Sequence, residues 1–285
     1  MSSPLIYSIL EPPMEIAPLI TAKQQTYREA YGEWALVTGA AEGIGAEFAT
    51  QLAAQGLNIV LADVQIDKAQ QHALQLAQQY GVKTLAVECD LSQPSFIDQL
   101  LKQTSDLAIG FLICCAGIGA TGAFSDTPLE AMHKAIQVNC MATVTLCHHF
   151  SPAMLERHRG AIIIVASNSA YAGAPYIANY AATKAYDLSL AEALWYEFKP
   201  LGIDVLGFSP QGTNTPGMRR GMPTLSEGEA PEGIMLADEA VRFALGQLGS
   251  IASIRPDLPE KYSLARQEVT TTAGGFTRTL AIHKG

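Results

Sequence analysis

Short apolar runs recur along the chain from Trp34 onward, and they are apolar at nearly every position instead of at every second one. The runs are WALV (34–37), NIVLA (58–62), TLAVE (84–88), GFLICC (110–115), AIIIVA (161–166) and IDVLGF (203–208). A strand that is buried on both faces has this composition, whereas in a strand with one solvent-exposed face apolar and polar residues alternate. The pattern therefore predicts six strands of a parallel sheet.

Amphipathic stretches separate these runs. They are DKAQQHALQLAQQY (67–80), SFIDQLLKQT (95–104) and TLCHHFSPAMLERH (145–158). Their apolar residues recur at the spacing of a helix with one buried face. Strands that alternate with helices indicate a parallel sheet covered on both sides. We therefore expect an α/β fold with a doubly wound parallel sheet, in a single domain over residues 32–285.

Two terminal segments fall outside this pattern. Residues 1–31 contain four prolines and show no clear period, so we expect an extension that lies over the domain or is partly loose. Residues from about 250 to 285 form a C-terminal tail whose sequence indicates no particular role.

The bulk composition narrows the function classes. Hydrophobic residues make up 48% of the chain and charged residues 16%, which is typical of a protein with a sizeable core. A net charge of −9 without any basic run argues against a nucleic-acid partner. No apolar stretch approaches the roughly 20 residues of a membrane helix, and the proline-broken N-terminus does not resemble a signal peptide. We expect a cytoplasmic protein that binds no membrane.

The cysteines do not form a ligand pattern. An odd number, five, is spread over Cys89, Cys114, Cys115, Cys140 and Cys147. Several lie in apolar runs, as reduced core thiols do. Because neither a Cys-x-x-Cys motif nor a Cys/His ligand spacing accompanies them, we expect no metal site.

A glycine-rich turn follows the first predicted strand, in LVTGAAEGIGAEFATQLAAQG (36–56). Gly39 permits a tight turn, Gly43 lets backbone N–H groups approach a pyrophosphate, and Gly45 lets the following helix pack closely. The helix N-terminus would direct N–H groups and a partial positive charge at the phosphates. A glycine turn without a ligand is the alternative, but strand, glycines and helix in this order favour a dinucleotide site.

Two carboxylates indicate which dinucleotide this site would hold. The second predicted strand ends at Asp63, eighteen residues after Gly45. An acidic residue at about this distance can accept hydrogen bonds from the adenine ribose, and it would repel a 2′-phosphate. Glu42 adds a carboxylate where a phosphate site would hold Lys or Arg. Both charges favour NAD over NADP, although Asp63 could also be an ordinary polar strand end.

Tyr180 and Lys184 are four residues apart in ANYAATKAYDLSL (178–190), a helix-favouring stretch. This spacing puts both side chains on one helix face, about one turn apart. So short a pattern also occurs by chance, and its meaning depends on the motifs around it.

Taken in order, these motifs resemble the short-chain dehydrogenase/reductase family, in its compact single-domain form with a Rossmann fold. The resemblance runs from about Trp34 to Thr215 and includes the glycine turn that begins at Thr38. It also includes Asp90–Leu91, whose Asp would contact the adenine. The family's Asn-Asn-Ala-Gly segment appears as residues 114–117 with both asparagines replaced by cysteine. The sheet-stabilising role of that segment must then be met differently, while Ala116 and Gly117 can still line the cofactor.

By the same resemblance, the catalytic residues are Asn139, Ser167, Tyr180 and Lys184. Pro210 and Thr215 match the segment that caps the nicotinamide, but Gln211 stands where the family has glycine, which affects the placement of Thr213 and Thr215. The implied cofactor contacts are Gly39, Glu42, Gly43, Ile44, Gly45, Asp63, Asp90, Leu91, Ala116, Gly117, Asn139, Tyr180, Lys184, Pro210, Thr213 and Thr215.

The resemblance implies interconversion of a secondary alcohol and a ketone by hydride transfer, with Tyr180 as the general acid and base. A free tyrosine has a pKa near 10. A Lys ammonium about 4 Å from its oxygen favours the ionised form by about 4 kcal/mol at an effective dielectric near 20. Lys184 would act in this way and bind the nicotinamide ribose. Ser167 would stabilise charge on the substrate oxygen, and Asn139 would support a proton-relaying water.

The segment over residues 213–238 contains Gly, Pro and Met, and it suits a mobile lid over the substrate. Met218, Met222 and Met235 could form an apolar wall for a bulky alcohol or ketone, or simply pack the loop. Two alternatives stay open: an NADPH-dependent ketoreductase and a dinucleotide-binding protein without turnover. The partner we expect is a small molecule, with a homo-oligomer possible.

Overall fold

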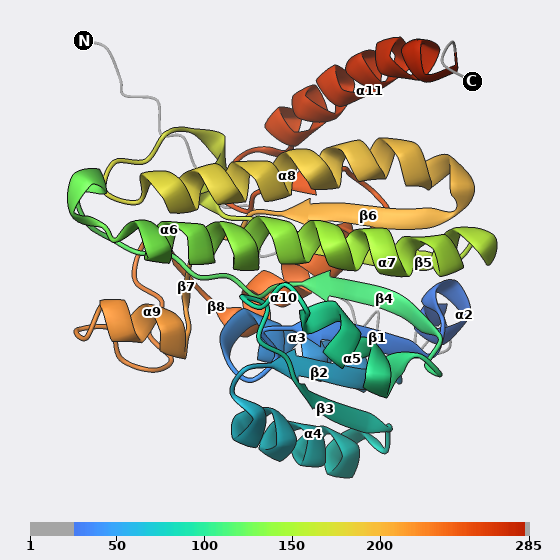
Figure 1. Cartoon of the computed structure of the whole chain (residues 1–285), viewed down its shortest axis with the longest axis horizontal. Helices are drawn as coiled ribbons and strands as arrows, with labels where there is room; N and C mark the ends of the chain where they lie inside the picture. Colours follow the sequence, from blue (N-terminus) through green and yellow to red (C-terminus); the bar gives the residue numbers. More distant parts are fainter. Residues whose placement is uncertain (1–25, 283–285) are drawn as a thin grey trace, which may run out of the picture.

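The computed structural model describes residues 26–282 (Figure 1). Its centre is a seven-stranded parallel sheet in the order β3-β2-β1-β4-β5-β6-β9. The strands are β1 (Trp34–Thr38), β2 (Asn58–Asp63), β3 (Thr84–Glu88), β4 (Ile109–Cys114), β5 (Gly160–Val165), β6 (Ile203–Phe208) and β9 (Ser253–Ile254). The six strands predicted from apolar runs are all present, and the doubly wound α/β fold is confirmed. The seventh, β9, has two residues, which is too short to produce a recognisable pattern.

Helices cover both faces of the sheet, as its nearly uniform burial requires. One face carries α3 (Gly43–Ala54), α4 (Ile66–Tyr80) and α10 (Ala237–Gln247). The other carries α5 (Phe96–Thr104), α7 (Ala142–Glu156) and α8 (Ala178–Phe198). The shorter α6 (Leu129–Ile136) leads into α7 through a π-helical turn at Gln137–Met141. No helix in the described part of the chain is long and apolar enough to cross a lipid bilayer.

Part of the predicted N-terminal extension packs against the domain. Residues 26–31 form α2 (Thr26–Tyr31), whose two tyrosines contact the ring of Phe111. The Tyr31 hydroxyl donates a hydrogen bond to Asp204 Oδ2 at 3.0 Å. Residues 1–25 of the extension lie outside the described residues.

The segments after the sheet strands build the rest of the molecule. The predicted lid contains β7 (Gly212–Asn214), α9 (Pro216–Gly221) and β8 (Ile234–Leu236), and β7 pairs with β8 in parallel. The predicted C-terminal tail contains β9 and the long helix α11 (Glu260–Ile282), which lies beside α8 at the edge of the molecule (Figure 1). A bidentate ion pair between Arg266 of α11 and Glu192 of α8 joins these two helices.

Candidate active site

The chain reverses its direction of winding between β1 and β4, so the connections after these two neighbouring strands run to opposite faces of the sheet. Such a switch point leaves a crevice at the carboxyl ends of the strands, where doubly wound folds bind their ligands. Here the crevice is a cleft of about 850 Å³. Every predicted cofactor residue except Asn139 lines it, and so does Ser167. Residues spread over nearly two hundred positions are thereby brought to one surface.

The glycine turn forms the floor of this cleft. Gly39 and Gly43 both have positive φ angles, 68° and 66°, in the left-handed region that favours glycine. A Cβ at Gly45 would lie 2.1 Å from the carbonyl oxygen of Gly39, so only glycine lets α3 start this close to β1. The helix begins after Glu42, whose side chain makes no capping hydrogen bond. Backbone N–H groups at this helix end can therefore take an anionic ligand.

Asp63 ends β2 at the rim of the cleft, with its carboxylate turned back to the glycine turn. It accepts hydrogen bonds from the N–H of Ala41 and the N–H of Gln65, both at 2.9 Å. These contacts fix the orientation of a side chain that is otherwise buried. Each carboxylate oxygen keeps a lone pair that can accept from a ribose hydroxyl.

Glu42 is paired on two sides. It accepts from Lys68 Nζ at 2.9 Å and from Arg220 of α9 at 2.5 Å, and these contacts hold the pKa of its carboxyl below the usual range, Arg220 contributing most. The sequence analysis treated Glu42 as a bare negative charge and missed both partners. The sequence does not indicate the pairing with Arg220, because that residue is 178 positions away. The pair also joins the lid segment to the glycine turn across the cleft.

The predicted adenine contact, Asp90, follows β3 on the same side of the cleft. Its carboxylate accepts from the N–H of Ser92 at 3.0 Å and from the Ser92 hydroxyl at 2.7 Å. These hydrogen bonds, the Ser92 hydroxyl first, keep the pKa of Asp90 below its ordinary value. The neighbouring Leu91 is buried. Asp90 and Leu91 therefore present to the cleft one carboxylate fixed by hydrogen bonds and one apolar side chain.

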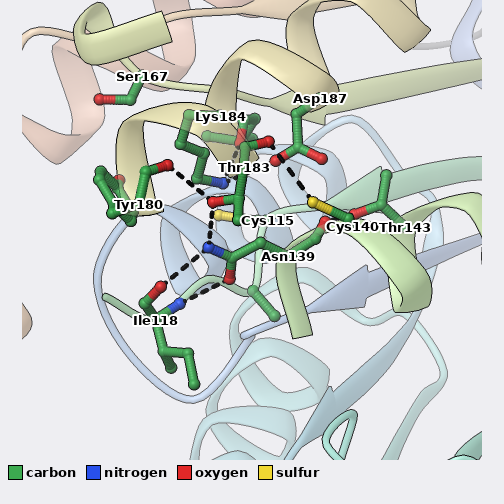
Figure 2. A network of polar contacts seen from close by, with 12 residues as sticks. Cys115, Ile118, Asn139, Cys140, Thr143, Ser167, Tyr180, Thr183, Lys184 and Asp187 are labelled. Carbon is green, nitrogen blue, oxygen red and sulfur yellow. Dashed lines mark hydrogen bonds and ion pairs between the residues drawn. The ribbon is translucent and has the colours of Figure 1, made fainter. Parts of the chain in front are cut away.

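Tyr180 and Lys184 lie one turn apart near the start of α8, and both line the cleft (Figure 2). The Lys184 ammonium donates to the carbonyl oxygen of Val165 at 2.8 Å and to Asp187 Oδ2 at 3.0 Å. Two of its three N–H groups are therefore used within the protein. Burial lowers the pKa of Lys184, but the Asp187 carboxylate and the Tyr180 oxygen outweigh this, and the pKa lies above its usual value.

Asp187 was missed in the sequence analysis, although the i, i+3 spacing from Lys184 is a signal that could have identified it. Burial raises the pKa of the Asp187 carboxyl, and the neighbouring Lys184 only partly offsets this. The two side chains form the buried end of the polar network in Figure 2.

Asn139 lies in the π-helical turn before α7 and is completely buried. Its Oδ1 accepts from the N–H of Ile118, and its Nδ2 donates to the carbonyl oxygen of Ile118, both at 2.9 Å. The second Nδ2 hydrogen goes to the Thr183 hydroxyl at 2.8 Å. The Thr183 hydroxyl in turn donates to the carbonyl oxygen of Tyr180. Asn139 therefore lies behind the cleft wall and connects two of the segments that line it.

Ser167 follows β5 and starts the short helix η3 (Asn168–Tyr171). Its Oγ accepts from the N–H of Ser169 at 3.2 Å and from the Ser169 hydroxyl at 3.0 Å, and it contacts Asn168 Oδ1 at 3.3 Å. These bonds hold the Ser167 hydroxyl in the cleft wall. The hydroxyl hydrogen is donated to Asn168 Oδ1, and a substrate oxygen that displaced this acceptor would receive it.

The segment after β4, where two cysteines replace asparagines, is held by Thr38. The Thr38 hydroxyl accepts from the N–H of Cys115 and of Ala116 and donates to the carbonyl oxygen of Ile113. One hydroxyl thus joins β1 to the end of β4. Burial raises the pKa of the Cys115 thiol to about 12, so this thiol is a neutral packing group.

The segment after β6 closes the cleft. Pro210 accepts from the N–H of Asn168 at 3.1 Å, and the Thr213 hydroxyl donates to the carbonyl oxygen of Gln211 at 3.0 Å. The Thr215 hydroxyl caps α9 by accepting from the N–H of Met218. A Cβ at Gly43 would lie 3.1 Å from the Thr215 methyl group, so the lid segment rests against the glycine turn. Gln211 also lines the cleft, in the position of the family's glycine.

Comparison with known proteins agrees with this geometry. Residues 33–224 match the sequence pattern of the short chain dehydrogenase family. A 7beta-hydroxysteroid dehydrogenase of Collinsella aerofaciens is 34% identical over 228 residues, which cover 80% of this chain and 87% of that protein.

Solved structures match as well. A structure from a study of 7beta-hydroxysteroid dehydrogenase stereoselectivity has a TM-score of 0.76 at 30% identity, covering 87% of this chain and 98% of that one. A short-chain dehydrogenase from Sphingobium yanoikuyae in complex with NADPH has a TM-score of 0.74 at 28% identity, covering 84% of this chain and 95% of that one.

Proposed function

This chain belongs to the short-chain dehydrogenase/reductase family, and we propose that it interconverts a ring hydroxyl and a ketone on a hydroxysteroid-like molecule, with NAD as its cofactor. As a member of this family it is an oxidoreductase that uses an NAD(P) dinucleotide and acts on CH–OH groups. The observation that carries the proposal is that Tyr180 and Lys184 line the same cleft as the glycine turn.

The residues around the cleft suit a dinucleotide and an alcohol. The bound nicotinamide supplies or accepts the hydride. Tyr180 moves a proton to or from the substrate oxygen, and Ser167 donates a hydrogen bond to that oxygen while charge develops on it. Lys184 keeps one N–H group for the cleft, where it can orient the nicotinamide ribose. Asn139 fixes the wall segment at Ile118 and, through Thr183, the backbone at Tyr180.

Apolar surface beside the cleft supports a bulky substrate. A small hollow lined by Phe124, Met132 and Tyr176 shares Ala120 and Ile177 with the main cleft. The rings of Phe124 and Tyr176 are exposed there, and exposed apolar patches of this kind mark ligand grooves. The similarity to 7beta-hydroxysteroid dehydrogenases points to the same class of rigid, apolar alcohol.

NAD is the proposed cofactor because Asp63 and Glu42 both present carboxylates at the glycine turn. NADP is the second candidate, favoured by two observations. Lys68 and Arg220 stand directly beside Glu42 and could accept a 2′-phosphate if Glu42 moved. The similar Sphingobium yanoikuyae structure holds NADPH.

The experiment pairs cofactor and substrate. The purified protein is assayed with NAD and NADP, in both directions, on hydroxysteroids that differ in the position and face of the hydroxyl and on small secondary alcohols. We expect turnover of one hydroxysteroid position with NAD, and a drop of about 10²-fold or more in Tyr180→Phe with unchanged cofactor binding. Preference for small alcohols would contradict the substrate, and a larger thermal shift with NADP than with NAD would contradict the cofactor.

A further inference from the structure

The Lys184 ammonium is paired with the carboxylate of Asp187, which is almost entirely buried. Asp187 Oδ2 is 3.0 Å from Lys184 Nζ, and the two residues are 1% and 3% exposed. Lys184 lies between Tyr180 and Asp187 along α8 (Figure 2). The ammonium that faces the Tyr180 oxygen on one side is therefore paired with the Asp187 carboxylate on the other.

Other groups around this pair do not change its charge balance. The thiols that face it are Cys114 and Cys115 at the end of β4 and Cys140 in the π-helical turn. Burial raises the pKa of Cys115 to about 12 and of Cys140 to about 11, and the pKa of Cys114 is also raised, chiefly by its contact with Cys147. Cys114, Cys115 and Cys140 are therefore neutral at physiological pH.

Three further polar groups lie around the pair. The phenol of Tyr186, also on α8, faces Asp187 at longer range, and burial raises its pKa. Asp63 faces the Cys115 thiol from the end of β2. Thr143 of α7 approaches Asp187, but its hydroxyl donates to the carbonyl oxygen of Asn139 at 2.6 Å. Asp187 Oδ1 has no hydrogen-bond partner in the described part of the chain.

A carboxylate in this position is not explained by stability. Removing two charges from water costs several kcal/mol each, so a buried ion pair contributes little to folding compared with apolar packing. An unpartnered buried oxygen adds to that cost. The electrostatic consequence, in contrast, falls directly on the cleft, because the field of a paired ammonium at the Tyr180 oxygen is weaker than that of a lone one.

We propose that Asp187 is a positioning residue of the reaction, which holds the Lys184 ammonium in place and offsets its charge beside Tyr180, so that Tyr180 loses its proton less easily than it would beside a lone ammonium. The inference rests on the proposed function and specifies how the proton-transferring group of that site is tuned. In ketone reduction the carbonyl carbon would accept a hydride from the reduced nicotinamide, and the carbonyl oxygen would accept the Tyr180 proton. The phenolate left behind regains a proton from solvent.

The test measures Tyr180 itself, without turnover. Tyrosine labelled with ¹³C at the ring ζ carbon is incorporated, and the Tyr180 signal is assigned by its loss in Tyr180→Phe. Its titration is followed by NMR in the wild type, in Asp187→Asn and in Asp187→Ser, the last two removing the charge with side chains of different size. Seven residues of helix separate the carboxylate from Tyr180, a rise of about 10 Å. One charge at that distance and an effective dielectric near 20 shifts a titration by about one unit.

We expect the Tyr180 midpoint to fall by about one pH unit in both variants, and the acidic limb of kcat/KM for alcohol oxidation to fall with it. Asp187→Glu, which keeps the charge, should return the midpoint toward the wild-type value. An unchanged or higher midpoint in the folded variants would overturn the proposal.

Glu192→Gln is the matched control. It removes a second buried carboxylate of α8, the partner of Arg266, away from the cleft. It should lower stability and leave the Tyr180 titration unchanged. An equal shift in Glu192→Gln would also overturn the proposal, because the effect would then be structural. If the titration shifts as expected but no alcohol is oxidised, the proposed function fails instead, so the two failures are distinguishable.

Discussion

The side-chain amide of Asn139 makes hydrogen bonds to both backbone polar groups of Ile118. Its Oδ1 accepts from the Ile118 N–H and its Nδ2 donates to the Ile118 carbonyl oxygen, each at 2.9 Å. A side chain from the turn before α7 therefore fixes the position of the segment around Ile118, which follows β4 and lines the cleft. Because Asn139 is fully buried, no water can replace these bonds without rearrangement. The amide of one residue orders the surface that a cofactor would contact.

Asn139→Ala should therefore affect both stability and activity. The substitution removes three hydrogen bonds, each of which contributes about 0.5–1.5 kcal/mol, so urea unfolding should show a loss of about 1.5–4.5 kcal/mol. The wall at Ile118 should also loosen, with a lower kcat/KM. Asn58→Ala is the control, since buried Asn58 bonds the N–H of Lys83 near the start of β2. It should lose stability only, and an equal loss of kcat in both variants would contradict the role of Asn139.

Gly119 gives the Tyr180 ring its space. A Cβ added there would lie 2.7 Å from Cδ2 of Tyr180 and 3.0 Å from Cγ, so the ring must move. Since displacement of a catalytic group by about 1 Å can cost about 10²-fold, we expect Gly119→Ala to lower kcat by about 10-fold to 100-fold with near-normal cofactor affinity. Gly173→Ala, where an added Cβ meets nothing within 4 Å, should leave kcat unchanged. The measurement is steady-state kinetics together with cofactor titration by calorimetry.

Reversing the charge at Glu42 should shift cofactor choice. Glu42→Arg frees Lys68 and Arg220 from their shared partner and adds a third cation at the glycine turn. Because charge-assisted hydrogen bonds contribute about 1.5–3 kcal/mol, the ratio of the Kd for NAD to that for NADP should rise by about 10-fold or more. The same charge change in Glu197→Arg, on an exposed part of α8, should not alter the ratio. No change in Glu42→Arg would show that the 2′ position binds elsewhere.

The buried thiols predict an alkaline loss of stability. Burial raises the pKa of Cys115 from about 9 to about 12. Between these values the unfolded chain gives up its thiol proton while the folded chain keeps it, so the free energy of unfolding decreases as pH rises. For Cys115 the loss from pH 9 to pH 10.5 should be about 1.5 kcal/mol. Urea unfolding should show a shallower decline in Cys115→Ala, and an identical decline in both proteins would contradict the assignment.

The sheet and the glycine turn could be predicted because their causes are local. A strand buried on both faces must be apolar at consecutive positions, and a chain that turns from β1 into α3 within a few residues needs glycine where a Cβ would strike Gly39. The shared helix face of Tyr180 and Lys184 could also be predicted, since helical periodicity puts residues four apart on one face. Strand β9 could not be predicted, because two residues are too few to show a period. They form a strand because they pair with the exposed edge of β6.

By itself, then, the sequence determined the layered α/β fold, its glycine turn and the shared helix face of Tyr180 and Lys184. Only the tertiary structure decided the charge that each site residue experiences. Glu42 is neutralised by a cation 178 positions away, and the ammonium beside Tyr180 is balanced by Asp187 inside the protein. The reason is physical: steric and periodic constraints act between neighbours in the chain, whereas the strength of a charge depends on which distant groups fold against it and on how much water they exclude.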